Sequence, residues 1–103
     1  MKYAATRPAR HLFVCTNRRD DDDPLGSGCG ERGDRVYDAL KDQVATRGVH
    51  QTVWVTRTHC LGICPRRGAT VAMYETGARA SASAPIVTEV EPSDALDLVR
   101  GQP

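Results

Sequence analysis

The chain has 103 residues, of which 40% are hydrophobic and 26% charged, and its formal net charge is +1. These values indicate one globular domain over residues 1–103, and they exclude a disordered chain and a strongly basic protein that binds nucleic acid. No apolar run approaches the roughly 20 residues that cross a bilayer, and the basic N-terminus lacks the apolar centre of a secretory signal. We therefore expect a cytoplasmic protein whose four cysteines stay reduced and serve a metal or redox chemistry.

The first predicted strand covers residues 11–14, a short and mostly apolar run that ends at Cys15. Residues 16–33 predict a long loop, because they contain four consecutive aspartates, a proline and four glycines. Cys29 lies inside this predicted loop. A run of like charges in a loop is usually a solvated tip, so we assign the aspartates no function.

A helix is predicted to begin after the loop, with Asp34 as its N-cap. Val36, Leu40 and Val44 recur at every fourth residue and mark its buried face. Gly48 follows the last turn and is the expected C-cap. This is the clearest helical pattern in the chain.

A second strand is predicted over residues 52–56, which are rich in β-branched side chains. A strand, a crossover helix and a second strand predict a right-handed βαβ unit with parallel strands, whose carboxyl ends meet at one edge of the sheet. That geometry brings Cys15 to the same end of the domain as Cys60 and Cys64, although about 45 residues separate them along the chain.

The last third of the chain predicts a pair of strands, 69–75 and 85–89, joined by residues 76–84. A short final helix is expected to start near Pro92, to bury Leu96 together with its apolar neighbours, and to end before Gly101. The predicted fold class is therefore α/β (α+β).

The four cysteines have the spacing Cys15-x13-Cys29-x30-Cys60-x3-Cys64. Thiolates are soft ligands, and four of them can hold one tetrahedral zinc or a [2Fe–2S] cluster. Structural zinc is usually bound by two close pairs of cysteines, and only the last pair has that form here. A cluster distributes its ligands over two irons, so the spacing favours a cluster; the alternative is a zinc-stabilised interaction module with four cysteine ligands and no redox activity.

Two other interpretations of the cysteines fit less well. Thiols that act as small hydrophobes belong in apolar runs, whereas Cys29 lies between two glycines and Cys64 precedes a proline. A thiol-based redox enzyme normally shows Cys-x-x-Cys at the start of a helix, and this chain has no such pair. His59 is expected to be a surface histidine, because four cysteines already complete the ligand set.

The residues around the cysteines suit a cluster as well. Gly28, Gly30 and Gly62 can adopt positive φ and let backbone N–H groups approach sulfur atoms. Several arginines near the cysteines can offset the negative charge of a cluster, although each one can equally be a solvated surface residue. Those singled out here all lie within four residues of a cysteine: Arg18, Arg19, Arg32, Arg66 and Arg67.

The sequence resembles the thioredoxin-like [2Fe–2S] ferredoxins over roughly residues 10–100. The resemblance is carried by Phe13-Val14-Cys15-Thr16-Asn17-Arg18 at the end of the first strand, by Gly28-Cys29-Gly30, and by Cys60-Leu61-Gly62-Ile63-Cys64.

This resemblance implies a thioredoxin-like fold in which a central mixed four-stranded sheet and two helices carry the cluster loops at one end. It implies a [2Fe–2S] cluster bound by Cys15, Cys29, Cys60 and Cys64. It also implies an electron carrier, not an enzyme, which exchanges one electron with redox partner proteins, a reductase and an acceptor enzyme, and which is often a homodimer.

Overall fold

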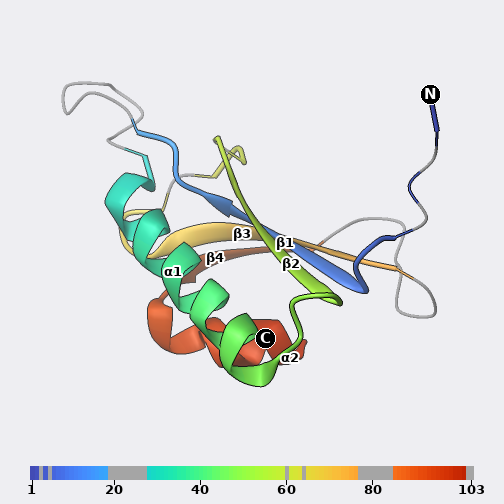
Figure 1. Cartoon of the computed structure of the whole chain (residues 1–103). Coiled ribbons are helices and arrows are strands. Elements are labelled where there is room, and N and C mark those ends of the chain that lie inside the picture. Colours follow the sequence, from blue (N-terminus) through green and yellow to red (C-terminus); the bar gives the residue numbers. More distant parts are fainter. Residues whose placement is uncertain are drawn as a thin grey trace.

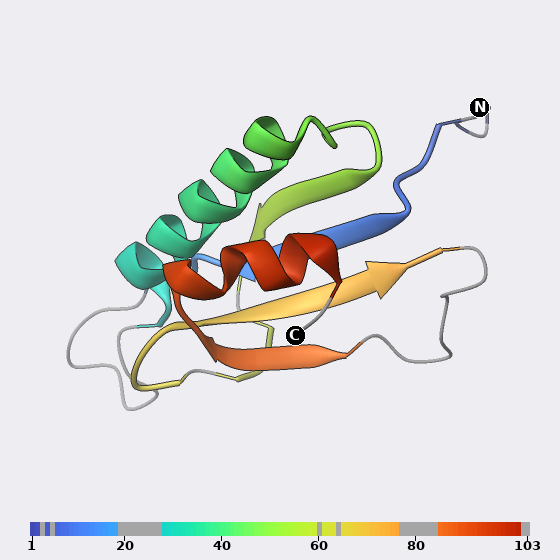
Figure 2. The same cartoon turned by 90° about the horizontal axis from the view of Figure 1, so that it is seen from below.

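The computed structural model describes residues 1–2, 4, 6–18, 28–59, 61–63, 65–76 and 85–101. Its strands form one mixed sheet in the order β2-β1-β3-β4, and both helices lie on the same face of that sheet (Figures 1 and 2). The predicted α+β fold with four strands and two helices is confirmed. No helix within the described ranges is long and apolar enough to cross a membrane. The elements are β1 (Arg10–Cys15), α1 (Gly30–Arg47), β2 (Val53–Thr58), β3 (Ala69–Glu75), β4 (Ile86–Val90), the 3₁₀ turn η2 (Pro92–Asp94) and α2 (Ala95–Arg100).

The register of the sheet brings separate parts of the chain to one end. Strands β1 and β2 are parallel and pair from Arg10 with Val53 to Cys15 with Thr58, as predicted. Strand β3 runs antiparallel to β1 and therefore starts where β1 ends. We call this end of the molecule the rim, and it comprises the described residues of the segments 15–18, 28–33, 58–63 and 65–68.

The hydrophobic core lies between the sheet and the two helices. Alternate residues of β1 point into it, because successive side chains of a strand face opposite sides. The helices contribute the residues that recur on one face, which is the predicted pattern for α1. The fully buried residues include Leu12 and Val14 of β1, Val36 and Leu40 of α1, Val71 of β3 and Leu98 of α2.

The start of α1 differs from the prediction. The helix begins at Gly30 with Cys29 as its N-cap residue, and Asp34 lies inside it. The glycines that suggested a continuing loop have a packing role instead: a Cβ on Gly33 would lie 2.0 Å from the carbonyl oxygen of Cys15. The first turn of α1 therefore packs directly on the end of β1, which only glycine permits.

The other elements agree more closely with the sequence. Gly48 ends α1 in the left-handed conformation, with φ of 65°. Strand β3 has the predicted bounds, and β4 is displaced by one residue. The final helix buries Ala95, Leu98 and Val99, while Leu96 is only half-buried. Of the predicted connection 76–84, residues 77–84 lie outside the described part of the chain.

Candidate metal centre

Cys15 and Cys29 lie at the rim on two regular elements that pack against each other. Cys15 is the last residue of β1, and Cys29 is the N-cap residue of α1. The amide of Gly30 donates a hydrogen bond to the carbonyl of Asn17 at 2.9 Å, which joins the chain just after Cys15 to the chain just after Cys29. The structure thus brings these two cysteines, 14 positions apart in the sequence, to the same end of the sheet.

Both of these thiols are buried, although the sequence had predicted a position outside the core for Cys29. Cys15 is 0% exposed and Cys29 is 1% exposed, and both belong to the main hydrophobic cluster. The glycines beside Cys29 had indicated a position outside the core, and that expectation is wrong. Cys29 is buried because α1 begins earlier than predicted. The helix packs on β1, so its N-cap residue is covered by the sheet.

Cys60 and Cys64 lie outside the described residues, but the residues on either side of them are described. Leu61 packs against the core cluster, while Ile63 is 42% exposed. The buried hydroxyl of Thr70, at the start of β3, donates a hydrogen bond to the carbonyl of Ile63 at 3.1 Å. These flanking residues belong to the rim. That the four cysteines bind one metal centre stays a prediction.

Arg32 links the two cysteine-bearing parts of the rim. Its Nη2 donates hydrogen bonds to the carbonyls of Gly28 at 2.9 Å and Pro65 at 3.0 Å, and its Nη1 donates to the carbonyl of Arg66. Gly28 precedes Cys29 and Pro65 follows Cys64, so one guanidinium holds the neighbours of both cysteines.

The other arginines that the sequence grouped with Arg32 have different environments. Arg18 forms an ion pair with Asp34 at 2.6 Å. Arg67 pairs with Glu89 at 3.2 Å, and both of these side chains are exposed. Arg19 lies outside the described residues. The sequence did not separate Arg32 from this group, because two of its three partners are main-chain atoms more than 30 positions away.

The glycines of the rim adopt the predicted backbone conformation. Gly28 has φ of 79°, Gly30 has φ of 40° and Gly62 has φ of 95°. At Gly28 space is also limiting, since a Cβ there would lie 2.2 Å from the carbonyl oxygen of Asn17. At Gly62 a Cβ would have no neighbour within 4 Å, so the requirement for glycine is conformational.

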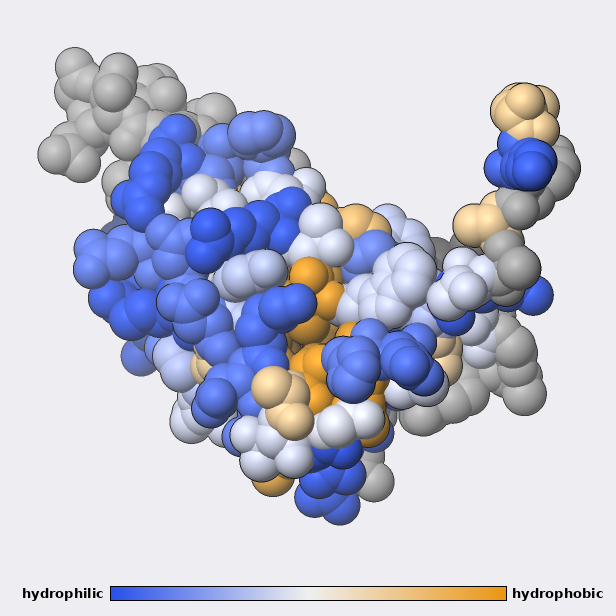
Figure 3. Space-filling model, in the orientation of Figure 1, coloured by the Kyte–Doolittle hydropathy of each residue, from blue (hydrophilic) through white to orange (hydrophobic). Residues whose placement is uncertain are grey.

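The surface on the α1 side of the rim is hydrophilic, and a narrow apolar strip lies between α1 and β2 (Figure 3). Arg57 at the end of β2 lies 3.9 Å from Asp34 and 3.8 Å from Asp38, and its guanidinium is 4.4 Å from the ring centroid of Tyr37. His59 is exposed, as expected of a surface histidine. Charges of both signs therefore surround the rim.

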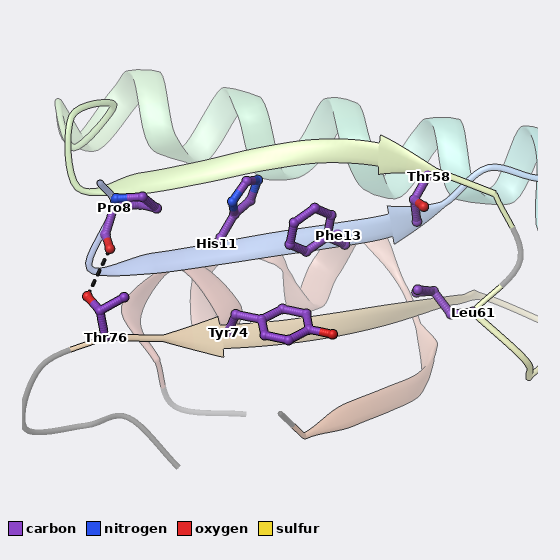
Figure 4. Close-up of a pocket in the computed structure, with 7 residues that line it drawn as sticks. All are labelled: Pro8, His11, Phe13, Thr58, Leu61, Tyr74 and Thr76. Carbon is purple, nitrogen blue, oxygen red and sulfur yellow. Dashed lines mark hydrogen bonds between the residues drawn. The ribbon is translucent and has the colours of Figure 1, made fainter. Parts of the chain in front are cut away.

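The sheet face opposite the helices carries a cluster of aromatic rings that the sequence did not single out (Figure 4). His11 stacks on Phe13 with centroids 4.0 Å apart, and Phe13 meets Tyr74 edge to face at 5.4 Å. Burial lowers the pKa of His11. A pocket of about 490 Å³ runs along this face, and its lining reaches the rim at Thr58 and Leu61. The sequence did contain a signal for this cluster: side chains alternate between the two faces of a strand, so residues 11 and 13 lie on the same face of β1.

Comparison with known proteins gives one consistent result. No family model matches the chain. A "Ferredoxin, 2Fe-2S" of Clostridium pasteurianum is 29% identical over 70 residues, which are 68% of this chain and 68% of that protein. A "Ferredoxin, 2Fe-2S" of Aquifex aeolicus is 34% identical over 70 residues, which are 66% of this chain but only 61% of that protein.

The structural comparison covers more of the molecule. The crystal structure of the wild-type thioredoxin-like [2Fe-2S] ferredoxin from Aquifex aeolicus matches with a TM-score of 0.73 and 26% identity, over 94% of this chain and 92% of that one. A second structure of a thioredoxin-like [2Fe-2S] ferredoxin from the same organism matches with a TM-score of 0.72. The predicted thioredoxin-like fold is confirmed.

Proposed function

We propose that this chain, which is similar to these proteins in both sequence and fold, is a thioredoxin-like [2Fe–2S] ferredoxin. Cys15, Cys29, Cys60 and Cys64 bind its [2Fe–2S] cluster. The protein is then a one-electron carrier between larger redox enzymes. The observation that carries the proposal is the structural match over more than nine tenths of both chains, at 26% identity. The zinc module and the thiol-based redox enzyme have no comparable support.

The described residues fit such a cluster in the chemistry of their donors. Cys15 and Cys29 are soft ligands that sit on a strand end and a helix start, so their backbones are held by regular structure. The flanks of Cys60 and Cys64 belong to the same rim.

The described residues at the two halves of the proposed ligand set differ in their exposure to solvent. Cys15 and Cys29 are buried and keep water away from the inner side of the site. The residues around the other pair are more open, since Gly62 and Ile63 are exposed. When bound, a [2Fe–2S] cluster supplies a single reversible one-electron step. We expect redox partners to approach the segment 61–63, because Gly62 and Ile63 are exposed at the surface.

Two further expectations belong to this proposal. The homodimer that the resemblance implies is compatible with the sheet face opposite the helices, where Tyr74 is 53% exposed and Ile86 is 48% exposed. Light scattering on the purified protein tests it, and a mass of 11.2 kDa would contradict it. The cytoplasmic location is tested by cell fractionation.

The cluster is tested by anaerobic purification after expression with ample iron. We expect red-brown protein with visible absorbance that bleaches on dithionite, and an EPR signal that appears on reduction. Colourless protein with one zinc per chain would contradict the proposal and support the zinc module.

Replacement of Cys29 gives the matching test of the ligand set. Cys29→Ala should abolish or severely reduce iron content and visible absorbance, because a thiolate ligand is lost. Asp42→Ala, at an exposed position of α1, is the control and should keep both at the wild-type level. Circular dichroism verifies that both variants fold. Wild-type absorbance in folded Cys29→Ala would show that Cys29 is not a ligand.

A further inference from the structure

Arg32 occupies a position where an arginine is electrostatically unfavourable. It is the third residue of α1, and the first turn of a helix favours negative charge. Arg35, one turn further along, has the usual surface environment and pairs with Glu31 at 3.3 Å. Arg32 forms no ion pair with any carboxylate of the described residues. The local sequence of the helix therefore does not explain why an arginine stands there.

The contacts of Arg32 offer an explanation in the tertiary structure. Its guanidinium donates to three main-chain carbonyls, one in the segment that leads into α1 and two in the connection between β2 and β3. The planar guanidinium presents its donors in a fixed fork, so a single arginine can bind carbonyls from separate segments, which lysine does less well.

The carbonyls that Arg32 binds belong to immediate neighbours of two proposed ligands. Gly28 precedes Cys29, and Pro65 follows Cys64. On the other side of Cys64, the hydroxyl of Thr70 binds the carbonyl of Ile63. Position 64 is thus bracketed by two anchored residues, and Arg32 ties one of those anchors to the segment that carries Cys29.

From these contacts we propose that Arg32 is a positioning residue for the cluster: it clamps the two cysteine-bearing segments together so that the four sulfur atoms are gathered before and after the irons bind. The inference rests on the proposed function for what is bound, but the clamp itself is a property of the chain. Without it, the connection between β2 and β3 gains freedom, and its ordering then has to be supplied by metal binding.

The charge of Arg32 has a second effect. Each electron added to the site makes it more negative, and a cation close by favours the more negative state. Arg32 should therefore raise the reduction potential. A merely structural arginine on the surface would leave the potential unchanged, so this readout separates the two roles.

The test compares three full-length variants. Arg32→Lys keeps the charge but loses the fork, Arg32→Gln loses both, and Arg35→Gln is the matched control, one turn along the same helix. Three quantities are measured: hydrogen–deuterium exchange of the protein as purified, the rate of cluster loss to an iron chelator, and the midpoint potential. Circular dichroism verifies the fold of each variant.

We expect faster amide exchange in residues 61–68 for both Arg32 variants, and cluster loss about tenfold faster or more, as is typical when a residue that orients metal ligands is removed. The potential should fall in Arg32→Gln and fall less in Arg32→Lys. Arg35→Gln should match the wild type in all three measurements.

The inference is overturned if Arg32→Gln exchanges and loses its cluster at the rates of Arg35→Gln. It is also overturned if exchange rises while the rate of cluster loss and the potential stay unchanged, since the clamp would then not act on the site. If the wild-type protein proves to hold no cluster, the proposed function fails, whereas the exchange measurement still reports whether Arg32 joins the two segments.

Discussion

Two arginines join distant segments of this protein through main-chain carbonyls, one at each end of β1. Arg10, at the start of the strand, is 5% exposed, donates to the carbonyls of Val99 at 2.8 Å and Leu98 at 3.3 Å, and lies 3.5 Å from the carboxylate of Glu75. Arg32, beyond the other end of the strand, is half-buried and binds carbonyls of loop residues.

The difference between them lies in what they bind. Arg10 binds carbonyls of the last turn of α2, of which Leu98 also accepts a hydrogen bond from the amide of Gly101 at 3.2 Å. It thereby joins that turn to the sheet from inside the core. Its loss should affect the stability of the whole domain. Arg32 holds segments outside the regular elements, which open at a lower cost than the core. Its loss should affect the rim and the site.

The largest effect is expected from Arg10→Met, which tests one side of this comparison. The substitution removes the ion pair with the Glu75 carboxylate, which is only 16% exposed, and two charge-assisted hydrogen bonds to carbonyls of the last turn of α2. The free energy of unfolding should fall by about 3–5 kcal/mol, measured by urea denaturation. Because the Nε of Arg10 is buried without a hydrogen-bond partner among the described residues, the lower end of this range is expected.

The control for this experiment is Arg100→Met, at the exposed end of α2, which should change the free energy of unfolding by less than about 0.5 kcal/mol. Below the unfolding transition, cluster loss in Arg10→Met should proceed at the wild-type rate. A variant that loses its cluster faster but unfolds at the wild-type urea concentration would reverse the assignment of the two arginines.

The second largest effect on stability is expected from Gly33→Ala, a substitution at the rim. In a helix interior this substitution normally stabilises by up to about 1 kcal/mol. Here the new Cβ would meet the carbonyl oxygen of Cys15 at 2.0 Å, so α1 must shift away from β1 and carry Cys29 and Arg32 with it. The variant should lose about 1–3 kcal/mol of stability by urea denaturation, and its iron content should fall.

Ala45→Gly is the control, because it makes the reverse substitution at an exposed residue of the same helix. It should cost about 1 kcal/mol through helix propensity alone and leave the iron content unchanged. If Gly33→Ala proved as stable as the wild type and kept its iron, the close packing of α1 on β1 would not be what requires glycine.

The smallest effect concerns the dependence of stability on pH. Burial lowers the pKa of His11 below the ordinary value of 6.5. The unfolded chain therefore binds a proton at a higher pH than the folded one, and stability should decrease as pH falls below about 6.5. Urea denaturation at a series of pH values should show this loss in the wild type and a smaller loss in His11→Gln. His50→Gln, at an exposed position, should keep the wild-type slope.

Much of the fold followed from local pattern. The apolar and β-branched runs at 11–14 and 52–56 predicted β1 and β2. The apolar residues at every fourth position from Val36 to Val44 predicted the body of α1. The parallel pairing of the two strands predicted that their ends meet at one rim. The start of α1 could not be predicted in this way. Glycines in a sequence indicate a loop, whereas in the structure they allow the first turn of α1 to pack closely on β1. The sequence does not show that the carbonyl of Cys15 lies next to Gly33.

The sequence by itself determined the cysteine spacing and, through strand parity and helix period, the end of the domain where the first cysteine must lie. Only the tertiary structure decided that Cys29 is buried, that Arg32 binds carbonyls on both sides of the rim, and that Arg10 caps α2. Propensity and spacing are properties of one segment, whereas a contact between residues 33 or 88 positions apart depends on how the chain returns on itself.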